Sequence, residues 1–236
     1  MHKLIRKFLG GVVFFCSVAL MSHAQASAVI DFEGDALTGL YFPGDTILQS
    51  GYALTVRNDF GSVDTEAAFF SGAPTGNATQ FYFNSNEGSL RLAREDAGLF
   101  NLTGFSAAFV PLNSFLTQLI VLIVSATDAT QSFQTVFSLG DTTQRASNYP
   151  FITFSDPMDF STFVNLSQVE FFACALTNAG VCLVPTNNNA QFALDDIQLT
   201  TPQVNAVPEP ASLPLLALGL VGLMLISRRK LRQYKN

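Results

Sequence analysis

Short runs of β-branched and aromatic residues recur along most of the chain, and they limit its possible folds more than any other feature. From Val29 to Leu199 these runs are separated by clusters of Gly, Asn, Asp and Pro, and helical periodicity is hard to find. Branched and aromatic side chains pack well on a pleated sheet, and the separating residues favour turns. We therefore expect strands at 52–57, 81–83, 89–93, 102–109, 119–124, 134–137, 169–172 and 190–194.

The spacing of these runs indicates the fold class. About ten or more short strands at such intervals are typical of an antiparallel β-sandwich, so we predict an all-β domain over residues 29–199. The run 119–124 is apolar on both faces, which predicts a central strand, and it is far too short to span a membrane. With 23 Phe and no Trp, the core is expected to be packed with phenyl rings.

The C-terminal segment combines prolines, an apolar run and a basic cluster. Two prolines, at 208 and 210, keep the chain extended because proline lacks a backbone N–H and fixes φ. The apolar run 211–226 corresponds to a helix of roughly 24 Å, short for a hydrocarbon core of about 30 Å. Basic residues after it hold the C-terminus in the cytoplasm. We predict a linker over 200–206 and a tail over 207–236 with a transmembrane helix at 211–227.

The first 28 residues are predicted to form a secretory signal peptide, with a helical apolar segment. Three basic residues among the first seven precede the apolar stretch 8–21, and small residues of the A-x-A type follow. Cleavage after Ala24, Ala26 or Ala28 is compatible with this pattern, and the sequence leaves the choice open. The Sec machinery and signal peptidase are the partners that such a peptide requires.

Removal of both targeting segments leaves a strongly acidic domain. Of the 12 lysines and arginines, eight lie at the two ends, which leaves four arginines against 17 acids and a net charge of −13. Both histidines, His2 and His23, also fall within the signal peptide. A nucleic-acid partner is excluded by this charge, because phosphate binding needs a basic surface.

The order of these C-terminal parts resembles the PEP-CTERM sorting signal of exported Gram-negative proteins, over Val207 to Lys230. The resemblance implies that exosortase, a membrane-embedded cysteine transpeptidase-like enzyme, reads the tail and that the tail is removed near its prolines. It also implies transient residence in the inner membrane and a final place at the cell surface or in the extracellular matrix. An ordinary membrane anchor is the alternative. The motif consists of Pro208, Glu209, Pro210, Arg228, Arg229 and Lys230.

The domain also resembles, more loosely, the jelly-roll sandwiches of other PEP-CTERM proteins and of carbohydrate-binding modules. Three segments carry this resemblance: 29–34, 100–105 and 192–199. In such folds the first and last strands often pair beside each other. A structural calcium ion often lies between these two strands.

Four carboxylates are candidates for that calcium site. Asp31 and Glu33 are two apart on the first strand and so share a face, and Asp195 and Asp196 lie on the last strand. Ca²⁺ takes about six to eight oxygen ligands, which converging carboxylates supply. A structural Ca²⁺ is the only cofactor that we expect. The alternative is that these acids are solvated residues at strand ends.

Cys174 and Cys182 are predicted to form a disulfide. The segment between them contains Asn-Ala-Gly, which favours a turn, and apolar residues flank it on both sides. Two cysteines placed across a hairpin in an oxidising compartment are expected to be bonded. A metal site lacks further Cys or His ligands, and the spacing does not match a redox C-x-x-C motif.

Catalytic constellations are hard to find in the domain. Without histidine there is no Ser-His-Asp triad and no histidine-ligated zinc, and no phosphate loop or dinucleotide fingerprint is present. A carboxylate pair for glycoside hydrolysis remains an alternative, with Glu66, Glu87, Glu95 and Glu170 as candidate acids. We expect a non-catalytic protein.

The expected function is that of a cell-surface or matrix protein associated with exopolysaccharide and biofilm, which the sorting signal implies. A carbohydrate-binding, lectin-like module is the main alternative. Sugar binding commonly uses aromatic platforms, and with no Trp the candidates are Tyr41, Tyr52, Tyr82 and Tyr149. Extracellular polysaccharide is therefore a candidate partner.

Overall fold

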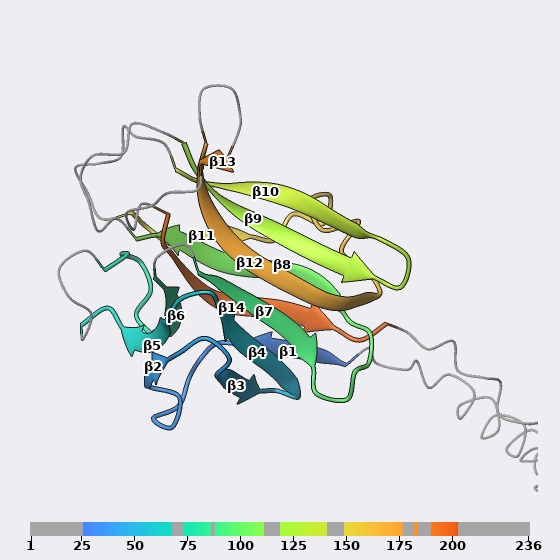
Figure 1. Cartoon of the computed structure of the whole chain (residues 1–236), viewed down its shortest axis with the longest axis horizontal. Coiled ribbons are helices and arrows are strands. Elements are labelled where there is room, and N and C mark those ends of the chain that lie inside the picture. Colours follow the sequence, from blue (N-terminus) through green and yellow to red (C-terminus); the bar gives the residue numbers. More distant parts are fainter. Residues whose placement is uncertain are drawn as a thin grey trace, which may run out of the picture. The chain divides into compact units, whose positions relative to one another are not determined.

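The computed structural model describes residues 26–67, 73–85, 88–110, 119–140, 149–176, 182–183 and 190–202. These residues form two antiparallel β-sheets packed face to face, which confirms the predicted all-β sandwich (Figure 1). Within these ranges no residue is helical. The predicted tail helix and residues 1–25 of the predicted signal peptide lie outside the described residues, and the last two predicted signal-peptide residues, Ser27 and Ala28, belong to a strand.

The first sheet has the strand order β11-β8-β14-β6-β5-β2, and β1 pairs with β14 beside β6. Each strand in it is held by antiparallel hydrogen bonding to its neighbours. Its strands are β1 (Ser27–Ile30), β2 (Gly39–Tyr41), β5 (Gly61–Thr65), β6 (Gln80–Asn84), β8 (Asn101–Phe109), β11 (Ile152–Phe154) and β14 (Phe192–Thr200).

The second sheet has the order β10-β9-β12-β7-β4-β3, with β13 paired to β12. Its edges are β10 and β3 along this order, and its longest strands lie together at the β9–β12 pair. Its strands are β3 (Thr46–Gln49), β4 (Tyr52–Arg57), β7 (Ser89–Arg94), β9 (Leu119–Asp128), β10 (Ser132–Gly140), β12 (Leu166–Leu176) and β13 (Cys182–Leu183).

The first and last strands pair with each other, as the resemblance implied. Ser27 lies opposite Thr200 and Ile30 opposite Ile197. The backbone N–H of Thr201 also donates to the carbonyl oxygen of Ala26, at 3.1 Å. The ordered sandwich therefore begins before residue 29, where the sequence placed its start.

Phenylalanine fills the space between the two sheets, as predicted. The ring of Phe105, on β8, lies 5.0 Å from Phe137, 5.2 Å from Phe154, 5.8 Å from Phe160 and 5.5 Å from Phe171, measured between ring centroids. Such ring pairs contribute about 0.5–1.5 kcal/mol each beyond the burial of area. These contacts join strands of both sheets around one buried ring.

Strand β9 is buried on both faces, which confirms the prediction of a central strand there. Leu122 and Val124 belong to the core between the sheets. Val121 and Ile123 point to the opposite face and are buried together with Cys174. Among the described residues, none forms a helix of the length and apolar character needed to span a membrane.

Candidate functional site

A row of six polar side chains crosses the outer face of the second sheet. Backbone register aligns one residue from each strand, and the residues before and after them along the strands, such as Val124 and Leu92, lie in the core. Because side chains alternate along a strand, the aligned residues point outward. Adjacent strands are about 4.8 Å apart, so the row is about 24 Å long. We call this set the polar row: Gln134, Ser125, Glu170, Arg91, Thr55 and Thr46.

Glu170 occupies the middle of the polar row. Its Oε1 atom accepts a hydrogen bond from the Ser89 hydroxyl at 2.5 Å, and the Nε atom of Arg57 lies 3.9 Å from the same oxygen. Arg91 is directly opposite Glu170 in the register, and its buried Nε atom has no hydrogen-bond partner among the residues that the structure describes. The centre of the row thus presents one carboxylate with two guanidinium groups on the same side of it, on β7 and β4.

This concentration of positive charge is unusual in the domain. The acidic domain has only four arginines, and two of them, Arg57 and Arg91, lie on this face. Guanidinium groups have five N–H donors and the carboxylate of Glu170 accepts. Hydroxyl and amide side chains at the ends of the row can both donate and accept. The arrangement can hydrogen-bond an extended, hydroxyl-rich ligand across several strands.

Asp195 is the most unusual of the four carboxylates proposed to bind calcium. It is only 1% exposed, and its Oδ2 atom accepts hydrogen bonds from Asn77 Nδ2 at 2.6 Å and from the Thr79 hydroxyl at 3.3 Å. Its Oδ1 atom accepts from the backbone N–H of Asp196. Burial raises the pKa of Asp195 to about 7, against the lowering effect of the Asn77 hydrogen bond.

The prediction that Asp31 and Glu33 share a face of the first strand was wrong, because β1 ends at Ile30 and the backbone of Phe32 between them has a positive φ of 54°. Glu33 Oε1 accepts a hydrogen bond from the backbone N–H of Gln80 at 2.9 Å. Gln80 follows Thr79, whose hydroxyl donates to Asp195. Asp31 Oδ1 accepts from Gln49 Nε2 at 2.6 Å, and Asp196 is exposed.

Within the ranges that the structure describes, no three Asp, Glu, His or Cys side chains are clustered as metal ligands. The carboxylate of Asp195 is a suitable ligand for a cation, because it is buried and takes part in none of the ion pairs seen in the described residues. The shared site of Asp31, Glu33, Asp195 and Asp196 stays a prediction.

The Cys174 sulfur is buried and disulfide-bonded. The hairpin predicted around it is present, because β13 pairs with β12 and places Cys182 in register with Leu176, two residues beyond Cys174. The side chain of Cys182 lies outside the described residues. The bond between Cys174 and Cys182 therefore stays a prediction.

A hollow of about 680 Å³ lies beside the β9–β10 turn and is lined by residues that include Asp128, Phe133 and Asn165. Asp128 is used by the turn itself. Its Oδ1 atom accepts hydrogen bonds from the backbone N–H groups of Thr130 and Gln131, and the first of these holds the pKa of Asp128 below its usual value. This carboxylate serves the turn.

The acids considered for glycoside hydrolysis do not form a pair in the described structure. Glu66 and Glu95 are exposed, Glu170 is bonded to Ser89, and Glu87 lies outside the described residues. Hydrolysis needs two carboxyl groups about 5–9.5 Å apart across the scissile bond. Glu170 is the only acid in the polar row.

Three of the four tyrosines considered as sugar platforms are not available for stacking. Tyr52, Tyr82 and Tyr149 are buried, and Tyr82 donates its hydroxyl hydrogen to Asn84 Oδ1 at 2.6 Å. Tyr41 is half-buried, and its hydroxyl donates to the Leu37 carbonyl at 2.6 Å. The interpretation as platforms was wrong for Tyr52, Tyr82 and Tyr149, whose rings lie in the core, and for Tyr41 it stays a prediction.

Comparison with protein families decides the meaning of the tail. Residues 206–230 match the model of the PEP-CTERM protein-sorting motif. This chain carries a PEP-CTERM protein-sorting motif. The motif, which includes the predicted Pro208-Glu209-Pro210 and the basic cluster, indicates an exported protein that exosortase sorts to the cell surface. Among curated protein sequences, none matches the chain.

Three solved structures of sugar-binding proteins are similar to this PEP-CTERM protein in strand arrangement. TmCBM61, in complex with β-1,4-galactotriose, aligns with a TM-score of 0.32 and 11% identity over 64% of this chain and 88% of its own. The family 11 carbohydrate-binding module of Clostridium thermocellum aligns with a TM-score of 0.33 and 12% identity, over 76% and 98%. The CBM22-1-GH10 modules of the Clostridium thermocellum xylanase 10B align with 0.32 and 14% identity, over 77% and 29%. We draw no inference about ligand or activity from similarities this low.

Sequence reasoning missed the partners that hold the candidate residues. Asn77 and Thr79 lie more than 100 residues from Asp195, and nothing in their local sequence marks them as its donors. The polar row was missed for a related reason. Alternation within β12 would have shown that Glu170 points away from the core, but only the register shows which residues it meets.

Proposed function

We propose that the mature sandwich of this PEP-CTERM protein is a non-catalytic component of the cell surface or extracellular matrix, associated with exopolysaccharide and biofilm. The observation that carries the proposal is the sorting motif at residues 206–230, which follows the last strand of the domain, β14, after a few residues. Sorting places the protein outside the cell, where polysaccharide is the main hydrated polymer. The acidic surface of the domain supports solubility in that setting.

A carbohydrate-binding role is the second candidate, and the polar row favours it. The row crosses six strands and offers donors and acceptors without a deep cavity, which suits an extended polymer of hydroxyl groups. The tyrosines of the described part are buried or locally bonded, so binding would depend mainly on hydrogen bonds from Arg91 and Glu170 rather than on ring stacking. We expect modest affinity for a single chain and stronger retention on a polymer that offers repeated contacts.

The non-catalytic assignment rests on the charges in this row. A glycosidase needs a second carboxyl group facing the first, and the row holds only Glu170, which is hydrogen-bonded to Ser89 and flanked by Arg57. Such a carboxylate can accept hydrogen bonds from a ligand. It has no partner acid in the row to protonate a leaving group.

The test is retention of the secreted, mature protein on a glycan array and on the polysaccharide of its host, with and without calcium. Two variants probe the row, Arg91→Ala and Glu170→Gln. Asp35→Asn is the matched control for Glu170→Gln, because it removes one negative charge from an exposed position elsewhere. Each row variant should lower retention by roughly 10-fold, since a hydrogen bond to a charged group contributes about 1.5–3 kcal/mol.

The outcomes separate the candidates. Absence of wild-type retention on every polysaccharide would reject the carbohydrate-binding candidate. Equal retention of wild type and both row variants would place any binding elsewhere on the domain. Release of reducing ends that is lost in Glu170→Gln would contradict the non-catalytic assignment.

A further inference from the structure

Strand β1 is short, and each of its residues is used by the fold. Ser27 to Ile30 pair with Thr200 to Ile197, and the side chain of Ala28 packs against the core. Ile30 is fully buried. The Val29 carbonyl accepts a hydrogen bond from the Ser50 hydroxyl at 3.1 Å.

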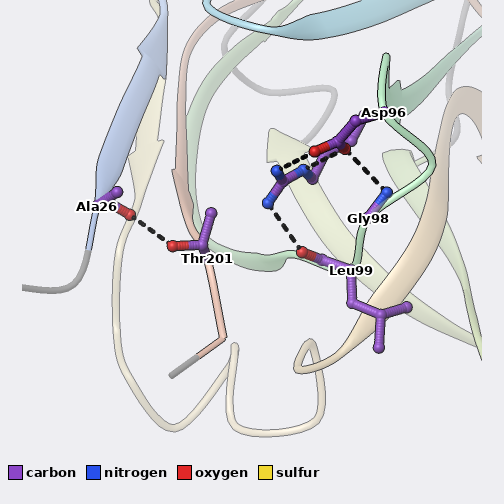
Figure 2. A network of polar contacts seen from close by, with 6 residues as sticks. Ala26, Asp96, Gly98, Leu99 and Thr201 are labelled. Atoms are coloured by element: carbon purple, nitrogen blue, oxygen red, sulfur yellow. Dashed lines mark hydrogen bonds and ion pairs between the residues drawn. The ribbon is translucent and has the colours of Figure 1, made fainter. Parts of the chain in front are cut away.

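The pairing extends one residue before β1. The carbonyl oxygen of Ala26 accepts a hydrogen bond from the backbone N–H of Thr201 at 3.1 Å. It also accepts one from the Thr201 hydroxyl at 3.4 Å (Figure 2). Ala26 itself is exposed, so its contribution is made by the backbone and not by the methyl group.

Strand β1 covers the part of one side of β14 that β6 does not reach, while β8 pairs with the other side. β6 pairs with β14 along Phe192–Leu194, and β1 pairs with Ile197–Thr200. Without β1, the backbone N–H and C=O groups on that side of Ile197–Thr200 would lose their sheet partners. Unpaired backbone groups at a sheet edge are costly and invite pairing with other chains.

These contacts distinguish the three cleavage positions left open by the sequence. Cleavage after Ala28 would remove Ser27 and Ala28, half of β1, and would place a charged α-amino group on Val29, next to the fully buried Ile30. Cleavage after Ala26 would remove the acceptor of both Thr201 hydrogen bonds. Cleavage after Ala24 retains every contact.

We propose that signal peptidase cleaves after Ala24, so that Gln25 is the first residue of the mature protein. The proposal rests on export of the protein and is independent of what the sandwich binds. It keeps the whole β1–β14 pairing and the Ala26–Thr201 hydrogen bonds in the mature chain.

The surroundings of Ala26 suit a positive chain end one residue upstream. A hollow of about 360 Å³ is lined by Ala26 and Thr201 together with Arg94, Glu95 and Asp96. The carboxylate of Asp96 accepts hydrogen bonds from Nε and Nη2 of Arg94, at 2.8 and 2.6 Å. It also accepts one from the backbone N–H of Gly98 (Figure 2). Two carboxylates against one guanidinium leave this hollow negatively charged, which favours an ammonium group nearby.

The test uses the full-length chain, exported by a Gram-negative host, with the N-terminal peptide of the mature protein identified by mass spectrometry. Signal peptidase needs small residues at the last and third-last positions of the peptide it removes. Ala24→Phe therefore blocks cleavage after Ala24 and Ala26, and Ala26→Phe blocks cleavage after Ala26 and Ala28. Ala26 is exposed, so Phe at this position should not disturb the core.

The expected result is a wild-type N-terminus at Gln25, normal processing of Ala26→Phe to the same residue, and loss of that product in Ala24→Phe. A mature N-terminus at Ser27 or Val29 would overturn the proposal. Accumulation of the uncleaved Ala26→Phe precursor would overturn it as well. Retention of Met1 in the wild-type protein would overturn both this proposal and the prediction of a cleaved signal peptide.

Discussion

Asn77 donates a hydrogen bond from Nδ2 to the Oδ2 atom of Asp195 at 2.6 Å, joining residues 118 positions apart. The acceptor is a buried carboxylate of β14, and its donors within the described residues are an amide, a hydroxyl and a backbone N–H. Neutral donors compensate only part of the cost of burying a charge. This relationship has consequences for stability at different pH values and for calcium binding.

The stability of the domain should fall as the pH rises towards neutrality in calcium-free buffer. Burial raises the pKa of Asp195 from 3.8 to about 7, and the neighbouring charge of Asp196 adds to this effect. Between these values the folded state holds a proton that the unfolded chain has lost, so the free energy of unfolding decreases with pH. The total loss is at most about 4 kcal/mol. Urea unfolding at pH 4 to 8 in EDTA measures it.

Asp195→Asn is the control, because its amide does not titrate in this range. The free energy of unfolding of this variant should vary less between pH 4 and 8 than that of the wild type. An equal pH dependence in the two proteins would assign the effect to another group.

Calcium should reverse the instability at neutral pH. If Asp195 shares a Ca²⁺ with Asp31 and Glu33, millimolar calcium raises the melting temperature, since a ligand bound only by the native state stabilises it by about 2.7 kcal/mol at 100 times its Kd. The gain should be larger at pH 8 than at pH 5, because the ligands must be ionised. Asp195→Asn should lose the gain and Asp35→Asn should keep it. A wild-type melting curve that is insensitive to both EDTA and calcium would reject the site.

Peptide mapping without reduction should recover Cys174 linked to Cys182. Loss of this link in the variant Cys174→Ala/Cys182→Ala should lower the free energy of unfolding by about 2–3 kcal/mol, as expected for closure of a short loop, without abolishing the fold. The reduced wild-type protein should show a similar loss. Free thiols at both positions in protein from the native host would contradict the pairing.

Gly61→Ala should destabilise the first sheet. A Cβ atom at Gly61 would lie 2.6 Å from Cζ of Tyr82, whose ring is fully buried and fixed by its hydrogen bond to Asn84. Overpacking of this kind costs about 1–3 kcal/mol, measurable by urea unfolding. Ser62→Ala is the neighbouring control and should change stability by less than about 0.5 kcal/mol. A wild-type value for Gly61→Ala would show that the Tyr82 ring can move aside.

Processing of the tail should be visible in the mass of the protein from its own host. We expect loss of the segment from near Pro208-Glu209-Pro210 to the C-terminus, in addition to loss of the signal peptide. Replacing Pro208 and Pro210 by alanine should leave the tail attached and the protein in the inner membrane. A wild-type protein that keeps the tail in the inner membrane would instead favour an ordinary anchor.

Several features were predictable because their signals are local. The alternation and composition of short segments predicted strands such as 102–109 and 119–124, and the structure has β8 and β9 there. The tail was recognised because a sorting enzyme reads a contiguous stretch of chain, so its parts must be adjacent in sequence. The excess of acids over bases also follows directly from composition.

The candidate site depended on contacts between distant segments. The tyrosines looked available because sequence alone does not show which face of a strand is covered, and Tyr82 proved to be buried against Phe32 and Phe192. The carboxylates Asp31 and Glu33, which follow β1, and those of β14 were expected near each other, and the two strands do pair. Their side chains nevertheless bond to Gln49, Gln80 and Asn77, which only the folded chain brings within reach.

The sequence by itself determined the all-β class, the sorting motif, the acidic surface and the set of three possible cleavage positions, because each is a property of neighbouring residues. The tertiary structure alone decided the polar row, the burial of Asp195 and the use of Ala26 by Thr201. Strand register joins residues far apart in the chain, and a shift of one residue would turn Glu170 from the outer face into the core. No local pattern specifies that alignment, which arises from the packing of two complete sheets around shared aromatic rings.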